Sequence, residues 1–359
     1  MSFAETIELA PGYAVSRVIR GGWQLAGGHG AVDPATVEAD LMAYYDAGIT
    51  TFDCADIYTG VEEMIGRFRA GVLARRGADA LARLKVHTKF VPDLDVLPRI
   101  DRAYVRTIIE RSLGRLRAER LDLVQFHWWD YAVPGAIETA AWLAELQAEG
   151  KIDLLGATNF DTPHLEALVE AGVPLKTLQV QYSLLDDRPS RAMAQACQRL
   201  GVRLLCYGAL AGGFLSERWL GSPEPQAPIE NRSLVKYRLM IEEFGAWGLF
   251  QELLEALKSI ADRHGVSLAA VAARAVLDRP AVGAVIIGAR NRDHLDASLQ
   301  IAALRLSDRD REQIDAVLAR RQGPAGDVYA LERDRTGRHG AIMKYNLNTD
   351  GASRTDGRA

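Results

Sequence analysis

The stretch DPATVEADLMAYYDAGITTFD, residues 33–53, is typical of a helix followed by a short buried strand. Asp33 and Pro34 indicate the helix start, because an Asp cap followed by Pro suits a first helical turn. Gly48 ends the helix shortly before the strand begins. The apolar residues that recur on one face of this helix are Val37, Leu41 and Tyr44. Such a helix-to-strand unit is the building block of a parallel sheet with crossover helices.

The same alternation of strand-like and helix-like segments continues along most of the chain, in eight units. Most of the strand-like runs are short and apolar, as expected for strands that are buried on both faces. Eight units without a linker predict an α/β fold of the (β/α)8 TIM barrel type, which needs about 250 residues. The segment from Val18 to Ala302 is long enough for such a barrel. The candidate strands are residues 18–22, 50–53, 85–90, 121–127, 152–157, 178–181, 203–207 and 284–287.

Two segments outside this alternation have expected places on the barrel. The turn-forming pair Pro11-Gly12 separates apolar runs at 7–9 and 13–15, which predicts an N-terminal β-hairpin over the barrel bottom. A long connection, about residues 208–245, follows the seventh strand. Because loops after barrel strands open onto the catalytic face, this connection is a candidate lid.

The C-terminal part begins with an amphipathic helix at about residues 308–320. From Gln322 the tail is rich in charge, Gly and Asn, which is typical of a terminus without fixed structure. Its apolar residues favour the alternative, which is packing over the barrel mouth or a neighbouring subunit. We expect one barrel domain over residues 1–320 and a C-terminal tail over 321–359, with a homo-oligomer formed through the tail as an option. The apolar tail residues are Val328, Tyr329, Leu331, Ile342, Met343 and Tyr345.

Composition narrows the class of partner. The 359 residues include 43 Lys and Arg against 47 Asp and Glu, so no broad positive field favours nucleic acid. The longest uncharged stretch, residues 204–216, is shorter than the roughly 18–20 apolar residues that cross a bilayer, so no membrane partner is expected. Residues 1–10 lack the pattern of a secretory signal, and the three cysteines have no paired spacing. We expect a cytoplasmic protein with reduced thiols and a small-molecule substrate.

Most familiar site motifs are absent. No G-x-G-x-x-G follows a strand, and the chain has no P-loop, no G-x-S-x-G and no H-E-x-x-H. The seven histidines are scattered without i, i+4 pairing, so no metal site is predicted. These absences argue against Rossmann dinucleotide enzymes, P-loop hydrolases, α/β-hydrolases and zinc peptidases.

Polar residues do occur at the carboxyl ends of three consecutive predicted strands, which end at Asp53, Lys89 and His127. Active sites of parallel barrels form at this end, and neighbouring strands lie about 4.8 Å apart. Tyr58 follows Asp53 closely enough for its loop to fold back over the same spot. We expect the Lys89 ammonium to lower the pKa of Tyr58. We expect Asp53 to keep Lys89 charged and oriented, so that Tyr58 can act as a proton donor. Each residue taken singly also has a purely structural explanation.

At these residues the chain resembles aldo-keto reductases of the bacterial monomer-like type. The matching segments occur in family order across nearly the whole barrel. They are GGWQLAGG (21–28), FDCADIY (52–58), VHTKF (86–90), RLDLVQFHWW (120–129), LLGATNF (154–160), LQVQYSLL (178–185), CYGALAGGFL (206–215) and IIGARNRDHLDAS (286–298).

The resemblance implies a catalytic tetrad of Tyr58 as general acid, Asp53, Lys89 and His127. It also implies a nicotinamide cofactor that is bound without a Rossmann fold. The nicotinamide carboxamide contacts that it implies are Thr158, Asn159 and Gln179, with Tyr207 stacking on the ring. Further expected cofactor-binding residues are Gly22, Trp23 and Asp53. The implied phosphate contacts are Gly208, Leu210 and Gly212 at the pyrophosphate and Gly288, Arg290 and His294 at the adenosine phosphate.

Cofactor and substrate preferences follow from a few of these residues. Arg290 can pair with a 2'-phosphate through its fork of donors, so we expect NADP, with NAD as the alternative. Trp23, Trp128 and Trp129 are candidates for an aromatic wall beside the substrate carbonyl, and core packing is their other explanation.

The expected activity is reduction of an aldehyde or ketone to an alcohol with NADPH. One alternative is an NAD(P)-dependent sugar or hemiacetal dehydrogenase that uses the same site in reverse. Another is a slow-turnover, cofactor-bound interaction subunit, which the unusual tail motivates and the intact tetrad opposes.

Overall fold

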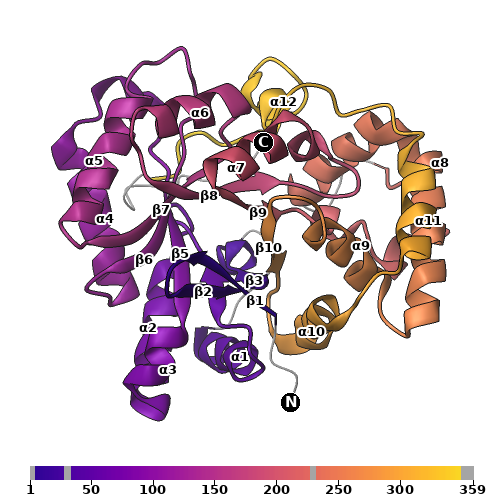
Figure 1. Cartoon of the computed structure of the whole chain (residues 1–359), viewed down its shortest axis with the longest axis horizontal. Helices are drawn as coiled ribbons and strands as arrows, with labels where there is room; N and C mark the ends of the chain where they lie inside the picture. The colour runs from indigo at the N-terminus through magenta and orange to yellow at the C-terminus, as the bar shows by residue number, and fades with distance from the viewer. Residues whose placement is uncertain (1–4, 28–33, 227–231, 349–359) are drawn as a thin grey trace.

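The computed structural model describes residues 5–27, 34–226 and 232–348 (Figure 1). Eight parallel strands close into a barrel in the order β10-β3-β4-β5-β6-β7-β8-β9. The predicted TIM barrel and its N-terminal hairpin are thereby confirmed. The barrel strands are β3 (Val18–Gly21), β4 (Thr51–Asp53), β5 (Lys85–Phe90), β6 (Leu121–Phe126), β7 (Ile152–Thr158), β8 (Leu175–Gln181), β9 (Arg203–Tyr207) and β10 (Val282–Gly288).

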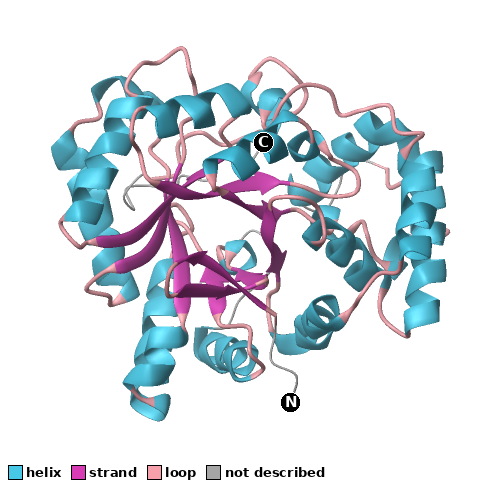
Figure 2. Cartoon of the chain, viewed as in Figure 1, coloured by secondary structure: helices cyan, strands magenta, loops and turns pink. Residues whose placement is uncertain are grey.

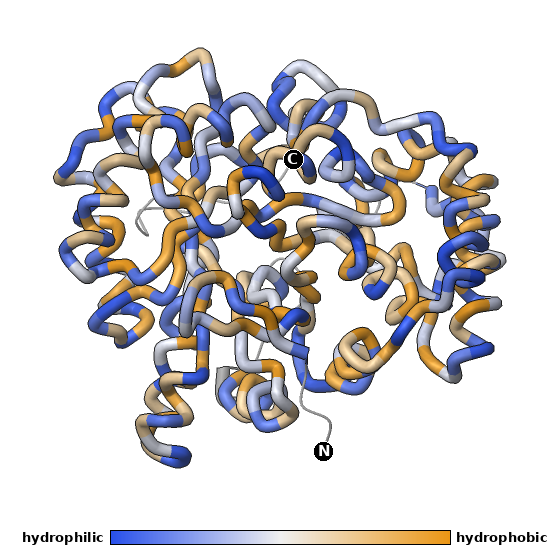
Figure 3. The backbone as a smooth tube through the Cα atoms, viewed as in Figure 1, coloured by the Kyte–Doolittle hydropathy of each residue, from blue (hydrophilic) through white to orange (hydrophobic). Residues whose placement is uncertain are grey.

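Helices surround the strands on the outside, as Figure 2 shows. Their tubes alternate between hydrophobic and hydrophilic segments (Figure 3), as expected for helices that pack one face against a barrel. The helices between barrel strands are α1 (Pro34–Asp46), α2 (Val61–Arg76), α3 (Ala78–Arg83), α4 (Arg102–Leu116), α5 (Ala136–Ala148), α6 (Thr162–Glu170), α7 (Ala192–Leu200), α8 (Arg232–His264) and α9 (Leu268–Leu277). After β10 follow α10 (Leu295–Ala303), α11 (Asp308–Leu318) and α12 (Ala330–Arg333). No helix within the described residues is both long and apolar enough to cross a membrane.

Strand β5 shows why these sequences form barrel strands. Side chains alternate between the two faces of a strand, so His87 and Lys89 point to the barrel interior while Val86 and Thr88 point to the helices. The Thr88 hydroxyl accordingly donates to the Glu62 carboxylate on α2, at 2.7 Å. Residues 86–90 are all buried, so both faces of β5 lie inside the protein although the strand carries polar side chains.

The hairpin of β1 (Thr6–Ala10) and β2 (Tyr13–Ser16) covers the amino-terminal end of the barrel. Tyr13 is buried there, with its ring centre 6.3 Å from that of His87. The Lys85 ammonium lies 4.9 Å from the centre of the Tyr13 ring. Tyr13 therefore helps to close the barrel floor, at the end opposite the expected chemistry.

The connection after β9 differs from the expected loop. Residues from Arg232 onward are helical and form the first part of α8, which has a kink at Gly245 (φ 143°) and Ala246 (φ 68°). Its apolar residues, such as Met240 and Phe244, are fully buried in a cluster with α9, α11 and the loops after β8 and β9, so tertiary packing stabilises a helix where no local signal marked one. Residues 227–231 of this connection and the predicted cap Asp33 lie outside the described residues.

The described part of the tail packs on the barrel of its own chain. It runs from α11 back across the carboxyl ends of the strands, where α12 lies (yellow in Figure 1). The amide of Leu94 donates to the carbonyl of Tyr345 at 2.9 Å. Asp93 accepts hydrogen bonds from the amides of Leu347 (2.7 Å) and Asn348 (2.9 Å). The tail therefore covers the barrel mouth.

Candidate active site

Asp53 and Lys89 form a buried ion pair at the carboxyl ends of β4 and β5. Nζ of Lys89 donates to Oδ2 of Asp53 and to the carbonyl of Cys54, both at 2.7 Å. Burial alone would lower the pKa of Lys89, but Asp53 and Tyr58 outweigh this effect and raise it. Lys89 therefore stays charged at neutral pH.

Two glutamine side chains fix the other oxygen of Asp53. Oδ1 accepts from Nε2 of Gln179 at 2.7 Å and from Nε2 of Gln125 at 3.2 Å. Gln125 on β6 lies in register with Lys89, and both point inward. The family resemblance implied that Gln179 contacts the nicotinamide. In the structure its side-chain amide donates one hydrogen bond to Asp53.

Tyr58 lies in the loop after β4, with its ring centre 5.2 Å from the Lys89 ammonium. Burial raises the pKa of Tyr58 to about 12, and the charge of Lys89 offsets only part of this rise. The expectation of a lowered pKa is therefore wrong, because it omitted the cost of burying a phenolate. Tyr58 is a neutral phenol at pH 7 and has a proton to donate.

His127 follows β6 and is 2% exposed. Its Nδ1 lies 2.9 Å from the carbonyl oxygen of Thr158, and because a carbonyl only accepts, Nδ1 carries the hydrogen. Burial and the Arg333 charge lower the pKa of His127 to about 3. The ring is therefore neutral at pH 7, and its buried Nε2, which has no partner among the described residues, is an acceptor.

Arg333 in the tail links the segments on both sides of His127. Its guanidinium donates to the carbonyls of Trp128 (2.6 Å), Trp129 (2.7 Å) and Asn159 (2.7 Å). The guanidinium carbon also lies 3.8 Å from the ring centre of Tyr131. Tail residue Arg333 thus holds together the loops that follow β6 and β7.

The residues predicted to hold the nicotinamide lie together at the ends of β7, β8 and β9. Asn159 has a left-handed backbone (φ 61°), and its amide donates to the carbonyl of Gln179 at 2.9 Å. The Tyr207 hydroxyl donates to Oδ1 of Asn159 at 2.9 Å. Thr158 is buried beside them. Gln179 links this group to Asp53 through its hydrogen bond to Oδ1.

The residues predicted at the pyrophosphate form a strip of bare backbone after Tyr207. Gly208 (φ 73°) and Gly212 (φ 64°) need the freedom of glycine, and Leu210 lies between them. A Cβ on Gly208 would come within 2.4 Å of the Tyr237 hydroxyl, and one on Gly212 within 2.7 Å of the Tyr237 ring. Backbone of this kind fits the close approach of a phosphate group, with Tyr237 above it.

The remaining predicted cofactor residues lie near the β10–β3 junction. Gly288 ends β10 in register with Gly21, and a Cβ there would meet the side chain of Gln24 at 2.2 Å. The amide of Gly22 donates to the carbonyl of Asp53 at 2.7 Å, which ties this junction to the tetrad. Arg290 and His294 are exposed, as an adenosine phosphate site requires.

The three predicted tryptophans separate into two groups. Trp23 is 41% exposed and its ring centre lies 4.9 Å from that of Tyr58, while Trp129 lies 4.2 Å from the His127 ring. Trp128 is fully buried, and its indole donates to the carbonyl of Val133 at 3.0 Å. The structure brings Trp23 and Trp129 to the tetrad and puts Trp128 in the core.

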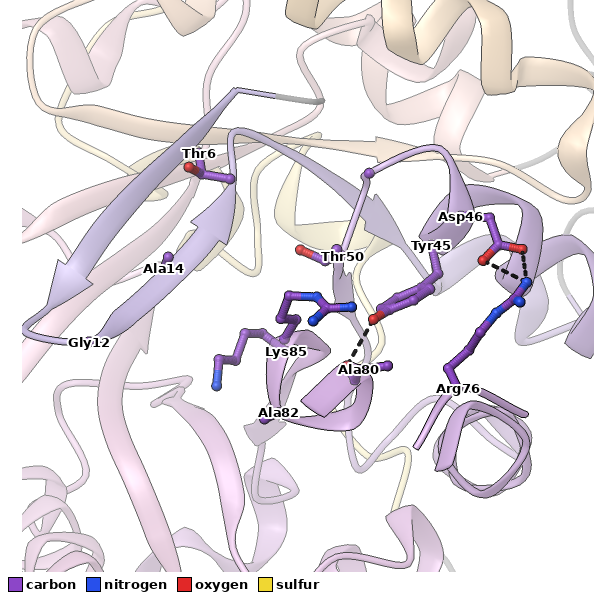
Figure 4. Close-up of a pocket in the computed structure, with 12 residues that line it drawn as sticks. Thr6, Gly12, Ala14, Tyr45, Asp46, Thr50, Arg76, Ala80, Ala82 and Lys85 are labelled. Atoms are coloured by element: carbon purple, nitrogen blue, oxygen red, sulfur yellow. Dashed lines mark hydrogen bonds and ion pairs between the residues drawn. The ribbon is translucent and has the colours of Figure 1, made fainter. Parts of the chain in front are cut away.

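A hollow of about 610 Å³ lies at the other end of the barrel, between the hairpin and the starts of β4 and β5 (Figure 4). There the Tyr45 hydroxyl donates to the carbonyl of Ala80 at 2.8 Å, and Arg76 pairs with Asp46 at 2.9 Å. None of the predicted site residues lines this hollow. Chemistry in TIM barrels occurs at the carboxyl ends of the strands, so we do not assign the hollow to the active site.

The sequence matches the model of the Aldo/keto reductase family over residues 17–319. The chain belongs to the aldo/keto reductase family. Members of this family are oxidoreductases that use nicotinamide cofactors, and the chain is an oxidoreductase of this kind.

Several relatives support the assignment. Aldo-keto reductase YhdN of Bacillus subtilis (strain 168) is 28% identical over 317 residues, which cover 86% of this chain and 91% of the relative. Chloroplastic pyridoxal reductase of Arabidopsis thaliana is 28% identical over 282 residues, 75% of this chain and 72% of the relative. The solved structure of glycerol dehydrogenase AKR11B4 from Gluconobacter oxydans matches with a TM-score of 0.73 at 26% identity, covering 89% and 97% of the two chains.

Sequence reasoning missed several residues of the mouth. Gln125, Lys236, Tyr237, Glu332 and Arg333 were not among the predicted site residues. The scarcity of lysine in this arginine-rich chain was a signal for Lys236. The apolar residues of the tail were a signal for the segment that contains Glu332 and Arg333.

Proposed function

We propose that this aldo/keto reductase reduces an aldehyde or ketone to an alcohol, with Tyr58 as the general acid. The observation that carries the proposal is the position of the Tyr58 ring, 5.2 Å from the Lys89 ammonium that Asp53 holds in a buried ion pair. A bound nicotinamide cofactor supplies the hydride in this chemistry. The chain's own residues bind and orient the carbonyl and hold the proton.

The proton comes from the hydroxyl of Tyr58, which donates to the substrate oxygen as negative charge develops there. The Lys89 ammonium then stabilises the resulting phenolate, and Asp53 keeps Lys89 charged and in place. General acid catalysis of this kind contributes about 10²–10⁴-fold to the rate. Trp23 and Trp129 lie at the tetrad and form apolar surface for the rest of the substrate.

We propose NADP as the preferred cofactor and NAD as the alternative. The bare backbone at Gly208 and Gly212 supports a dinucleotide pyrophosphate. The exposed guanidinium of Arg290, at the position of the family's adenosine phosphate site, supports a 2'-phosphate. We also propose a reducing compartment such as the cytoplasm, in line with three free, buried cysteines.

One observation favours the second candidate, alcohol oxidation by a sugar or polyol dehydrogenase. With its hydrogen on Nδ1, neutral His127 presents an acceptor at Nε2, which binds a hydroxyl group and not a carbonyl oxygen. A relative of similar structure is named a glycerol dehydrogenase. A hydroxyl next to the reacting carbon would use this acceptor in either direction of the reaction.

The test is the Tyr58→Phe variant. We expect turnover to fall by about 10²–10⁴-fold, while the affinity for NADPH, followed by quenching of tryptophan fluorescence, stays near that of the unchanged protein. Tyr104→Phe on α4, outside the barrel, is the matched control. Normal turnover in Tyr58→Phe would reject the assignment, and initial rates in both directions with both cofactors separate reductase from dehydrogenase.

A further inference from the structure

Lys236 on α8 is a buried cation that the proposed mechanism does not use. Its side chain is 15% exposed. Nζ lies 5.4 Å from the ring centre of Tyr207, 5.8 Å from that of Tyr237 and 5.9 Å from that of Tyr329. Lysines are rarely buried to this extent unless they are paired, so this ammonium group needs a partner.

Glu332 on α12 is the nearest carboxylate, and it is already engaged. Its Oε1 lies 3.8 Å from Nζ of Lys236, beyond hydrogen-bond distance. Both oxygens of Glu332 accept hydrogen bonds from Arg188, at 3.0 and 3.1 Å. Within residues 5–27, 34–226 and 232–348, no oxygen accepts a hydrogen bond from Nζ of Lys236. Its three donors are therefore available to a ligand.

The rings around Lys236 place it between the two halves of the candidate site. Tyr329 lies 5.8 Å from the His127 ring, on the side of the proposed carbonyl. Tyr237 lies over Gly208 and Gly212, on the side of the proposed phosphate strip. The Lys236 ammonium therefore lies near both parts of the candidate site.

We propose that Lys236 binds an anionic oxygen group, a carboxylate or a phosphate, at the barrel mouth. The group belongs either to an acidic carbonyl substrate or to the pyrophosphate of the cofactor, so the inference deepens the proposed function and rests on it. Among aromatic rings, with little water, the attraction between an ammonium and an oxyanion is stronger than in bulk water.

The experiment compares an acidic substrate with a neutral one of similar shape, 4-carboxybenzaldehyde with 4-methylbenzaldehyde. In Lys236→Met the ratio of their kcat/KM values falls by about tenfold or more, as expected when a hydrogen bond between charged groups is lost. Lys236→Arg, which keeps the charge, recovers part of the ratio. Lys258→Met, an exposed position on the same helix, is the matched control and leaves the ratio unchanged.

Cofactor titration distinguishes the two sources of the anion. A Kd for NADPH that rises about tenfold or more in Lys236→Met, with an unchanged substrate ratio, assigns Lys236 to the pyrophosphate. A fall in the substrate ratio with a smaller change in the NADPH Kd assigns it to the substrate. A ratio and a Kd that both stay within about twofold of the unchanged protein, a factor too small for a lost charged hydrogen bond, overturn the proposal.

A binding measurement keeps this inference separate from the proposed activity. Benzoate and benzamide are titrated by tryptophan fluorescence, which needs no turnover. If the protein reduces no carbonyl yet prefers benzoate, and Lys236→Met abolishes that preference, the proposed function fails and the anion site stands. If the unchanged protein shows no preference for benzoate and Lys236→Met binds NADPH normally, the anion site fails.

Discussion

At the scale of single residues, the protonation of His127 depends on a residue more than two hundred positions away in the chain. Arg333 donates to the carbonyls that flank His127, and its charge opposes a second positive charge on the ring. The hydrogen bond to Thr158 fixes which nitrogen carries the hydrogen. Burial and the Arg333 charge thus keep His127 neutral, while the hydrogen bond to the Thr158 carbonyl selects the tautomer and acts against the lowering of the pKa.

Arg333→Met tests this dependence. Removing the guanidinium should raise the pKa of His127 above about 3, toward its ordinary value, because one cause of the shift is gone while burial remains. Stability should also fall by at least the roughly 1.5–3 kcal/mol of one hydrogen bond to a charged group. NMR titration of the His127 ring measures the pKa, and its nitrogen shifts report the tautomer. A His127 pKa that does not move would show that Arg333 is only structural.

At the scale of elements, α12 is attached to the barrel through a buried ion cluster. Arg188, 1% exposed, donates to both oxygens of Glu332 on α12 and to Asp186 after β8. Burial raises the pKa of Glu332, but Arg188 and Lys236 outweigh this and lower it to about 2. One buried carboxylate thus anchors α12, in addition to the hydrogen bonds of Arg333 and Asp93.

Glu332→Gln should loosen this attachment. Removing one partner of a buried ion pair costs about 3–5 kcal/mol when the other charge is left uncompensated, and we expect a smaller loss here because Asp186 still pairs with Arg188. We expect faster trypsin cleavage after the tail arginines and a lower denaturant midpoint. Glu312→Gln, at an exposed position on α11, is the control and should change neither quantity. Cleavage at the original rate would mean that the apolar contacts of the tail suffice to hold it.

The elements also show which parts of the structure the sequence patterns predicted. Strands β5 and β9 begin and end where their apolar runs predicted, because buried parallel strands carry their signal locally. The approach of Asp53 to Lys89 followed from strand order, since parallel strand ends meet at one face. The contact of Arg333 with Trp128 joins residues 205 apart and has no periodic pattern. The tail contacts therefore required the structure.

At the scale of the whole molecule, the barrel interior is a place where histidine stays neutral. Burial, with the nearby charges of Lys89 and Lys85, lowers the pKa of His87 to about 3 from an ordinary 6.5. Below pH 6.5 the unfolded chain therefore takes up a proton that the folded chain does not. His87 thus reduces stability as the pH falls from 6.5 toward 3.

His87→Gln isolates this contribution. His127 acts in the same sense as His87, whereas buried Asp56, with its raised pKa, acts in the opposite sense, so the informative quantity is the difference between variant and unchanged protein. Between pH 6.5 and about 5 this difference in unfolding free energy should shift in favour of the variant, by at most about 1.4 kcal/mol per pH unit. Urea denaturation at several pH values measures it. Parallel stability curves for the two proteins would show that His87 becomes protonated in the fold.

The cover of the mouth also sets the order in which the protein is completed during synthesis. Every barrel strand precedes the tail in the chain, and domains begin to fold from the amino terminus as they emerge from the ribosome. A nascent chain that has exposed β10 holds all eight strands while the loops after β6 and β7 still lack Arg333. The described tail thus covers the carboxyl ends of the strands only after all of them have been made, and a chain that stops before Arg333 would leave the barrel mouth uncovered.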